Sequence, residues 1–231
     1  MTAIASNLQA VNQGIAKILG TAHRQVNEVT LLAVSKAFSA AVIRETYQAG
    51  QTVFGESYVQ EALEKINQLR DLPLQWHFIG PIQTNKTRAI AENFSWVHSV
   101  DRLKIAERLS AQRPENLPPL QVCIQVNVSG EDSKSGVMPP QLAELAQRVS
   151  RLPRLSLRGL MTIPAPTNDL ADQRILFSKL REMMQELNMQ GFSLDTLSMG
   201  MSHDMEAALL EGATIVRIGT AIFGVRNYEG E

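Results

Sequence analysis

The chain has 231 residues, of which 44% are hydrophobic, so it can bury a full core as one large α/β domain or as two small ones. Its formal net charge is −1 at pH 7. That balance excludes an overall field that would draw the protein to nucleic acid or to an anionic membrane, so any bound phosphate must be recognised locally.

Two further features of the sequence bear on where the protein works. Residues 1–25 lack the basic and then apolar pattern of a signal peptide, and no apolar run approaches the roughly 20 residues that span a bilayer. The single cysteine, Cys123, lies in the apolar run 120–126, which favours a small buried thiol over a nucleophile. We therefore expect a soluble, cytoplasmic protein, and the lack of a linker predicts one domain over residues 1–231.

Short β-rich runs alternate with helical patterns along the chain, after an extra predicted helix at residues 1–25. Strands are predicted at 30–35, 52–54, 75–79, 95–98, 120–127, 155–161, 196–199 and 215–218. Amphipathic helices are predicted at 40–49, 57–69, 84–92, 101–112, 139–151, 169–190 and 203–211, with Asp101 and Asn168 as N-caps. This alternation indicates parallel strands joined by right-handed crossovers, and eight such units satisfy the closure of a single (β/α)₈ TIM barrel. An open doubly wound sheet is the alternative.

Lys36 stands at the carboxyl end of the first predicted strand, directly after the apolar run 30–35. Because lysines are mostly exposed, the plain interpretation is that this side chain leaves the core for solvent. In a barrel, however, function collects at the carboxyl ends of the strands, and a lysine amine there can form a Schiff base with a carbonyl compound. The segments at the other end of the chain favour the second interpretation.

Those segments pair a glycine with a hydroxyl twice, as Gly200 with Ser202 and as Gly219 with Thr220. Glycine lets backbone N–H groups approach a phosphate closely. In a TIM barrel the phosphate site lies in the loops after the seventh and eighth strands, which is where both pairs fall. An amine together with a phosphate site is the minimal set for pyridoxal phosphate or for a phosphorylated carbonyl substrate.

Arg217 lies inside the apolar strand predicted at 215–218, where a guanidinium must find an acceptor. One interpretation is a structural ion pair with a carboxylate. The other is that Arg217 faces inward and donates to the ring nitrogen of the cofactor. An arginine keeps its proton, so it would leave that nitrogen unprotonated and the ring a weak electron sink. This argues against demanding carbanion chemistry.

Neither a nucleotide site nor a metal site is indicated. Residues 80–87 superficially resemble a P-loop, but Asn85 stands where that motif requires glycine before the lysine. His77 is expected to be a hydrogen-bonded core residue. The other histidines show no metal-ligand spacing, so no metal is predicted for His23, His98 and His203.

Five segments carry a specific combination of motifs: Ala33-Val34-Ser35-Lys36, Phe54-Gly55-Glu56-Ser57-Tyr58-Val59-Gln60-Glu61, and the segments 77–86, 160–164 and 197–224. Through these segments the chain resembles, over nearly all its length, the family of pyridoxal phosphate homeostasis proteins. That family is similar in fold to the N-terminal barrel of alanine racemase.

The resemblance implies that Lys36 holds pyridoxal 5'-phosphate as a Schiff base and that Arg217 faces the pyridine nitrogen. It also implies that the phosphate is held by Ser202, Gly219 and Thr220, with Ser198 nearby. Ser57 replaces the asparagine that the family usually has there, so its contact with the cofactor is expected to be shorter or bridged by water.

Alanine racemases carry a second, β-rich domain, whose tyrosine from the partner subunit is the acid/base on the face opposite the lysine. This sequence ends at Glu231, soon after the last predicted strand, so we expect neither that domain nor its tyrosine. Racemisation needs one proton removed and another delivered on opposite faces. We therefore expect a monomeric carrier of pyridoxal phosphate in vitamin B6 and amino-acid homeostasis, with apoenzymes or a regulatory protein as candidate partners. The alternatives are a slow amino-acid racemase that uses pyridoxal phosphate and a Schiff-base aldolase that uses Lys36 alone.

Overall fold

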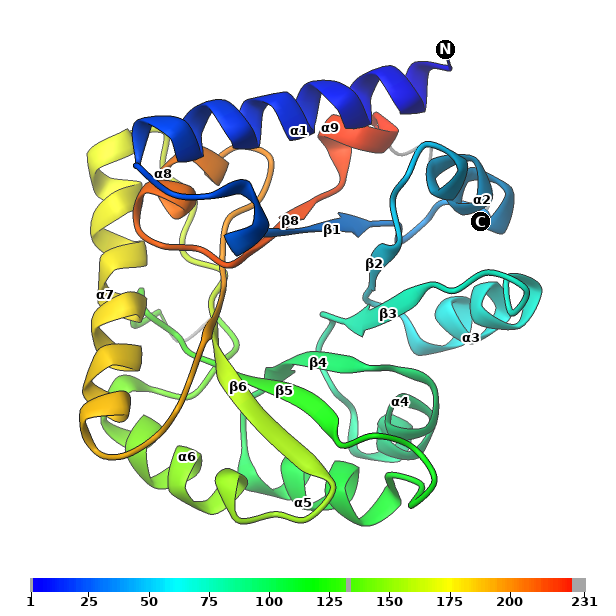
Figure 1. The fold of residues 1–231 in the computed structure, drawn as a ribbon. Coiled ribbons are helices and arrows are strands. Elements are labelled where there is room, and N and C mark those ends of the chain that lie inside the picture. The colour runs from blue at the N-terminus through cyan, green and yellow to red at the C-terminus, as the bar shows by residue number, and fades with distance from the viewer. Residues whose placement is uncertain (1, 132–133, 226–231) are drawn as a thin grey trace.

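The computed structural model describes residues 2–131 and 134–225. Its strands form one closed, parallel barrel in the order β1-β2-β3-β4-β5-β6-β7-β8 (Figure 1). Their bounds are β1 Thr30–Val34, β2 Val53–Glu56, β3 Gln75–Phe78, β4 Trp96–Val100, β5 Leu120–Gln125, β6 Leu155–Met161, β7 Thr196–Ser198 and β8 Ile215–Ile218. The barrel closes because β1 also pairs with β8, where Leu32 lies opposite Arg217. The predicted (β/α)₈ TIM barrel is confirmed, and the open sheet is excluded.

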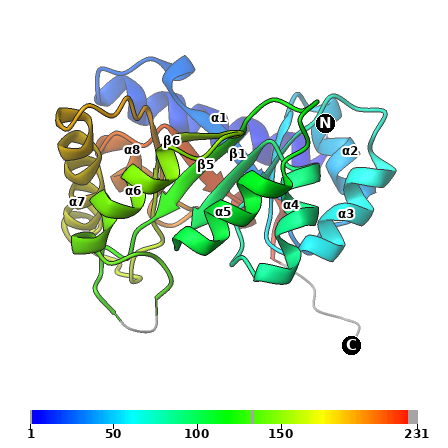
Figure 2. The same ribbon diagram turned by 90° about the horizontal axis from the view of Figure 1, so that it is seen from below.

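Helices form the outer layer around the strands, as Figure 2 shows from below. Their bounds are α1 Ala3–Thr21, α2 Ala40–Gln48, α3 Val59–Gln68, α4 Thr87–Asn93, α5 Leu103–Gln112, α6 Leu142–Ser150, α7 Leu170–Met189, α8 Met205–Leu210 and α9 Thr220–Phe223. Three 3₁₀ turns accompany them at Val26–Glu28, Thr84–Lys86 and Pro139–Gln141. The single turn of α9 was not predicted, because four residues are too few to show a helical period.

Both predicted N-caps were wrong by one residue. Arg102 occupies the N-cap of α5, and Asp101 instead forms an ion pair with it. Asp169 caps α7, where its carboxylate accepts the backbone N–H groups of Ala171 and Asp172. A side chain of this length satisfies the free N–H groups of a first turn only from the residue directly before the helix.

The predicted extra helix is α1, which runs along the outside of the barrel across α8 and α9 (Figure 1). Its buried side chains are Leu8, Val11, Ile15 and Leu19, which recur every three or four residues and so share one face. Among the residues that the structure describes, no helix is long and apolar enough to cross a membrane.

The strands alternate between two buried layers. Outward-facing side chains such as Phe54 and Phe78 pack under the helices in the main hydrophobic core. The predicted buried thiol is confirmed, since Cys123 is fully buried and burial raises its pKa to about 12. Polar residues also fill part of the barrel interior, among them His77, His98 and Arg217.

Candidate functional site

Six of the seven residues predicted for the site line one cavity of about 220 Å³ at the carboxyl ends of the strands: Lys36, Ser57, Ser202, Arg217, Gly219 and Thr220. They come from four strands of the barrel: Lys36 follows β1, Ser57 follows β2 and Ser202 follows β7, while Arg217 lies in β8 and Gly219 and Thr220 come directly after it. The remaining lining residues are Val34, Ile79, Ile163, Met201 and His203. Residues from opposite ends of the chain therefore meet in one place, as barrel closure requires.

Lys36 reaches this cavity from the turn that follows β1, two residues after the strand ends at Val34. Val34 and Lys36 are two residues apart, so strand alternation points both side chains to the same side, and both line the cavity. Ser57 is placed in the same way, two residues after Gly55 on the neighbouring strand, and Val34 pairs with Gly55 in the register of the sheet. The first two strands thus present an amine and a hydroxyl side by side.

Arg217 is almost fully buried, with 3% of its surface exposed. Its Nη1 donates to the carbonyl oxygen of Ser198 at 2.6 Å and to Ser198 Oγ at 2.9 Å, while Nη2 donates to the carbonyl oxygen of Thr162 at 2.8 Å. Burial lowers the pKa of Arg217 to about 10, and the charge of Asp204 opposes that shift. No carboxylate within the described ranges forms an ion pair with Arg217, so the structural ion-pair interpretation is not supported.

Ser198 is the one predicted site residue that does not line the cavity. It lies fully buried behind Arg217, and its hydroxyl oxygen is 2.7 Å from His98 Nδ1. His98 Nε2 in turn lies 2.9 Å from His77 Nδ1. A buried polar chain therefore runs across the barrel interior from Arg217 to His77, and the predicted role of His77 as a hydrogen-bonded core residue is confirmed.

His77 and His98, the two histidines of this buried polar network, are neutral. Burial lowers the pKa of His77 to about 3 and places that of His98 well below its usual value, helped by the charge of Arg217. The ring of His77 stacks on Trp96, with ring centroids 5.3 Å apart and an interplanar angle of 15°. Because both rings are neutral, neither histidine places a positive charge behind Arg217.

The turn after β7 is built around Gly200, whose φ is +93°. A Cβ at this residue would lie 2.5 Å from the Cβ of Ala208, so only glycine fits. Asp204 Oδ1 accepts the backbone N–H of Met201 at 2.6 Å, and the carbonyl oxygen of Gly200 accepts the N–H of Arg217 at 2.9 Å. These contacts hold Ser202 at the edge of the cavity.

Backbone donors are left available at this edge. Within residues 2–131 and 134–225, no acceptor receives the backbone N–H of Ser202 or of Gly219. The N–H of Thr220, the first residue of α9, has no acceptor within its own helix. Unused N–H groups beside hydroxyls and a buried guanidinium suit an anionic ligand.

Another glycine explains the segment that superficially resembled a P-loop. A Cβ at Gly80 would overlap the backbone of Ser57, so Gly80 lets the loop after β3 pack closely against the loop after β2. Ser99 Oγ donates to the carbonyl oxygen of Gly80 at 2.5 Å. The conformational demand at Gly80 is thus structural, and it helps to hold Ser57 at the cavity.

Four residues that line the cavity were not predicted from the sequence as its walls: Val34, Ile79, Ile163 and His203. Val34 ends β1, and Ile79 and Ile163 come within two residues of a strand end, which is a weak signal, whereas His203 lies further along the turn after β7. Within the described ranges there is no group of three or more His, Cys, Asp or Glu side chains that could hold a metal ion.

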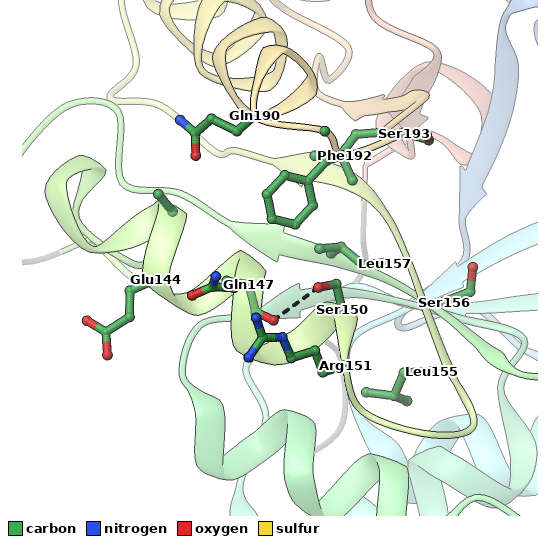
Figure 3. Close-up of a pocket in the computed structure, with 13 residues that line it drawn as sticks. Glu144, Gln147, Ser150, Arg151, Leu155, Ser156, Leu157, Gln190, Phe192 and Ser193 are labelled. Atoms are coloured by element: carbon green, nitrogen blue, oxygen red, sulfur yellow. Dashed lines mark hydrogen bonds between the residues drawn. The ribbon is translucent and has the colours of Figure 1, made fainter.

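A larger and more open hollow of about 760 Å³ lies at the other end of the barrel (Figure 3). It is lined by α6, the start of β6 and the segment that follows α7. Figure 3 shows Phe192 and Leu157 close together at its centre, while Glu144 points away from them. Because the amino ends of the strands serve stability in this fold, we assign no ligand to this hollow.

The chain matches known proteins in both sequence and structure. Residues 6–227 match the model of the family described as alanine racemase, N-terminal domain. The pyridoxal phosphate homeostasis protein of Pseudomonas aeruginosa is 60% identical over 228 residues, which cover 99% of this chain and 98% of that protein. The protein of the same name from Escherichia coli is 51% identical over 231 residues, which cover 99% of each.

Solved structures agree with this. PipY of Synechococcus elongatus with pyridoxal phosphate bound superposes with a TM-score of 0.84 at 39% identity, covering 96% of this chain and 100% of that one. An alanine racemase of Clostridium difficile has a TM-score of 0.76 at 14% identity and covers 99% of this chain but 57% of its own, which shows a shared fold alone. The chain therefore belongs to the family of pyridoxal phosphate homeostasis proteins and carries the alanine racemase N-terminal domain.

Proposed function

We propose that the protein binds pyridoxal 5'-phosphate in the 220 Å³ cavity, holds it as a Schiff base on Lys36, and serves vitamin B6 and amino-acid homeostasis. The names of the relatives and the PipY structure with pyridoxal phosphate support this proposal. The single observation that carries it is the sharing of one cavity by Lys36 and a buried Arg217 that contacts only neutral acceptors among the described residues.

The residues of the cavity fit the chemistry of this cofactor. Its phosphate would accept from Ser202, Thr220 and the unused backbone N–H groups, while its pyridine nitrogen would accept from Arg217. Ile79, Ile163 and Met201 offer apolar walls for a flat ring. When bound, pyridoxal phosphate supplies an aldehyde that exchanges reversibly between amines.

Each polar residue then has a separate task. Lys36 binds the cofactor through its amine, and Arg217 orients the ring. Because the pKa of Arg217 stays near 10, its guanidinium remains protonated at neutral pH and cannot give a proton to the ring nitrogen. The ring is thus kept a weak electron sink, which suits holding and releasing the cofactor better than breaking bonds at an amino-acid α-carbon.

The finer parts of the proposal concern how the protein works in the cell. We propose a single-domain monomer in the cytoplasm that passes pyridoxal phosphate to apoenzymes. Sedimentation of the purified protein, with and without pyridoxal phosphate, tests this part.

The first experiment compares wild type, Lys36→Ala and the control Lys17→Ala, which removes an exposed lysine on α1. Each protein is incubated with pyridoxal phosphate, its visible absorption is recorded, and borohydride trapping with peptide mass spectrometry locates the label. We expect a band above 400 nm and a label on Lys36, both lost only in Lys36→Ala. No band in wild type would overturn the proposal.

The same samples separate a carrier from an enzyme. D- and L-alanine are added in deuterated water, and the exchange of the α-proton is followed by NMR. We expect no exchange above that of free pyridoxal phosphate. Rapid exchange that depends on Lys36 would instead identify a racemase-like enzyme.

A further inference from the structure

Behind Lys36, on the outer face of the barrel wall, lies a cluster of four polar side chains that the cavity does not include: Ser35, Glu56, Glu61 and Lys65. Strand alternation explains its place, because Lys36 and Ser57 line the cavity while their neighbours Ser35 and Glu56 face the opposite way, toward α3. We call these four residues the outer cluster.

Lys65 is the centre of the outer cluster. Its Nζ donates to the carbonyl oxygen of Ser35 at 2.9 Å and to Glu56 Oε1 at 2.8 Å, and it also forms a close ion pair with Glu61 Oε1. Ser35 Oγ donates to the same Glu56 oxygen at 2.7 Å. Lys65 is 5% exposed, and Ser35 and Glu56 are fully buried. The residue before Lys36 is therefore held through both its side chain and its backbone.

The residue after Lys36 is held by the same cluster. Ala37 has a φ of +67°, a left-handed conformation that residues with a Cβ disfavour. Its backbone N–H donates at 2.6 Å to Glu61 Oε1, the same oxygen that pairs with Lys65. One glutamate oxygen thus joins the turn at Ala37 to the lysine that holds Ser35.

Fold stability alone does not account for this arrangement. Buried ion pairs are often no more stabilising than apolar residues of the same size. Glu56 Oε2 is buried and has no hydrogen-bond partner in the part of the chain that the structure describes, and burial raises the pKa of this carboxyl. The chain therefore bears a desolvation cost directly behind Lys36, which a role in placing that residue would explain.

We infer that Glu61 and Lys65 are positioning residues, which clamp both neighbours of Lys36 so that its amine enters the cavity in one fixed orientation. This inference rests on the proposed function, because the orientation matters for capture of pyridoxal phosphate by Lys36. The clamp acts through the backbone, since the outer cluster and the cavity lie on opposite sides of the barrel wall.

The test uses three variants of α3. Glu61→Ala removes the oxygen that serves both Ala37 and Lys65, whereas Glu61→Gln keeps an amide oxygen that can accept both bonds. Glu64→Ala is the matched control, because it makes the same change at an exposed residue of the same helix. Glu61 is only partly buried, with 30% of its side chain exposed, so its removal leaves the core intact.

Two measurements are made on each variant. Hydrogen exchange without pyridoxal phosphate reports whether the N–H of Ala37 is protected, independently of any cofactor. Titration with pyridoxal phosphate, followed by borohydride trapping, gives the dissociation constant and the share of label on Lys36. We expect Glu61→Ala to lose protection at Ala37 and to raise the dissociation constant at least about tenfold, with Glu61→Gln and Glu64→Ala close to wild type.

Other outcomes overturn the inference in distinguishable ways. Equal dissociation constants for wild type and Glu61→Ala would overturn the clamp and leave the proposed function intact. A fall in melting temperature and affinity that Glu61→Gln does not rescue would assign the outer cluster to stability alone and so overturn it as well. If wild type itself is not labelled on Lys36, the proposed function fails first, and the inference fails with it.

Discussion

Arg217 and Arg158 lie at opposite ends of the barrel and differ in whether a carboxylate pairs with the guanidinium. Arg158, in the middle of β6, forms a two-point ion pair with Asp195, with N–O distances of 3.0 and 2.5 Å, and its guanidinium lies 5.2 Å from the ring centroid of Trp96. Among the residues that the structure describes, Arg217, at the cavity, has only a hydroxyl and backbone carbonyls as hydrogen-bond partners. The hydrogen bond to Asp195 raises the pKa of Arg158, whereas burial lowers that of Arg217.

The difference separates a structural arginine from one prepared for a ligand. Arg158 is a third exposed and has a carboxylate, so its charge is already balanced. Arg217 is buried, and within residues 2–131 and 134–225 the negative charge that acts on it is that of Asp204, which forms no ion pair with it. Such a site is unfavourable for the empty protein and becomes favourable when an anion enters the cavity.

The largest expected effect comes from removing the charge of Arg217. Arg217→Gln keeps a donor for one of the carbonyl oxygens but loses a charged hydrogen bond to the cofactor, worth about 1.5–3 kcal/mol. We expect the dissociation constant for pyridoxal phosphate to rise roughly 10- to 100-fold. Absorbance titration measures this, and a change of less than twofold would show that Arg217 does not face the ligand.

The second prediction concerns the neutral histidines behind Arg217, which should make the folded protein less stable as the pH falls. In the unfolded chain His77 and His98 take up protons near pH 6.5, but burial keeps both neutral in the folded protein. The unfolded chain therefore binds more protons below that pH. We expect His77 to lower the free energy of unfolding by about 1.4 kcal/mol for every pH unit between roughly 6 and 4, and His98 to lower it further in the same direction.

His77→Asn tests this assignment. The asparagine amide can replace Nδ1 of His77 in the hydrogen bond with His98. It also removes Nε2, which is buried and has no hydrogen-bond partner among the described residues. The dependence of unfolding free energy on pH, measured with urea, should become shallower by about 1.4 kcal/mol per pH unit. An unchanged slope would mean that His77 is protonated in the folded protein.

How far the sequence predicts this molecule depends on the range of the interaction. The strands and helices follow local periodicity, and eight units imply closure, so the fold and the meeting of Lys36 with Arg217 were predictable. The partners of Arg217 were not, because two of them are backbone carbonyls that only the folded barrel brings together. For the same reason Ser198 was expected beside the phosphate, whereas it lies behind Arg217.

Asp204→Asn removes the negative charge that partly compensates the positive charge of Arg217. The amide oxygen can keep the bond from the N–H of Met201, so the turn at Gly200 stays in place while the negative charge is lost. Removing a charge that attracts Arg217 from within the protein should tighten binding of the anionic cofactor by about 1 kcal/mol, or fivefold. Asp169→Asn, at the exposed N-cap of α7, is the control, and weaker binding in Asp204→Asn would contradict the charge argument.

The smallest effect is expected at Arg158, where Arg158→Gln repeats the change made at Arg217. Its carboxylate partner Asp195 is half exposed, and an ion pair of that kind contributes less than about 1 kcal/mol. We expect a small loss in the free energy of unfolding and an unchanged dissociation constant for pyridoxal phosphate. Urea denaturation and absorbance titration measure the two quantities. If Arg158→Gln weakened binding as much as Arg217→Gln, loss of cofactor would reflect damage to the barrel as a whole, and the distinction between the two arginines would fail.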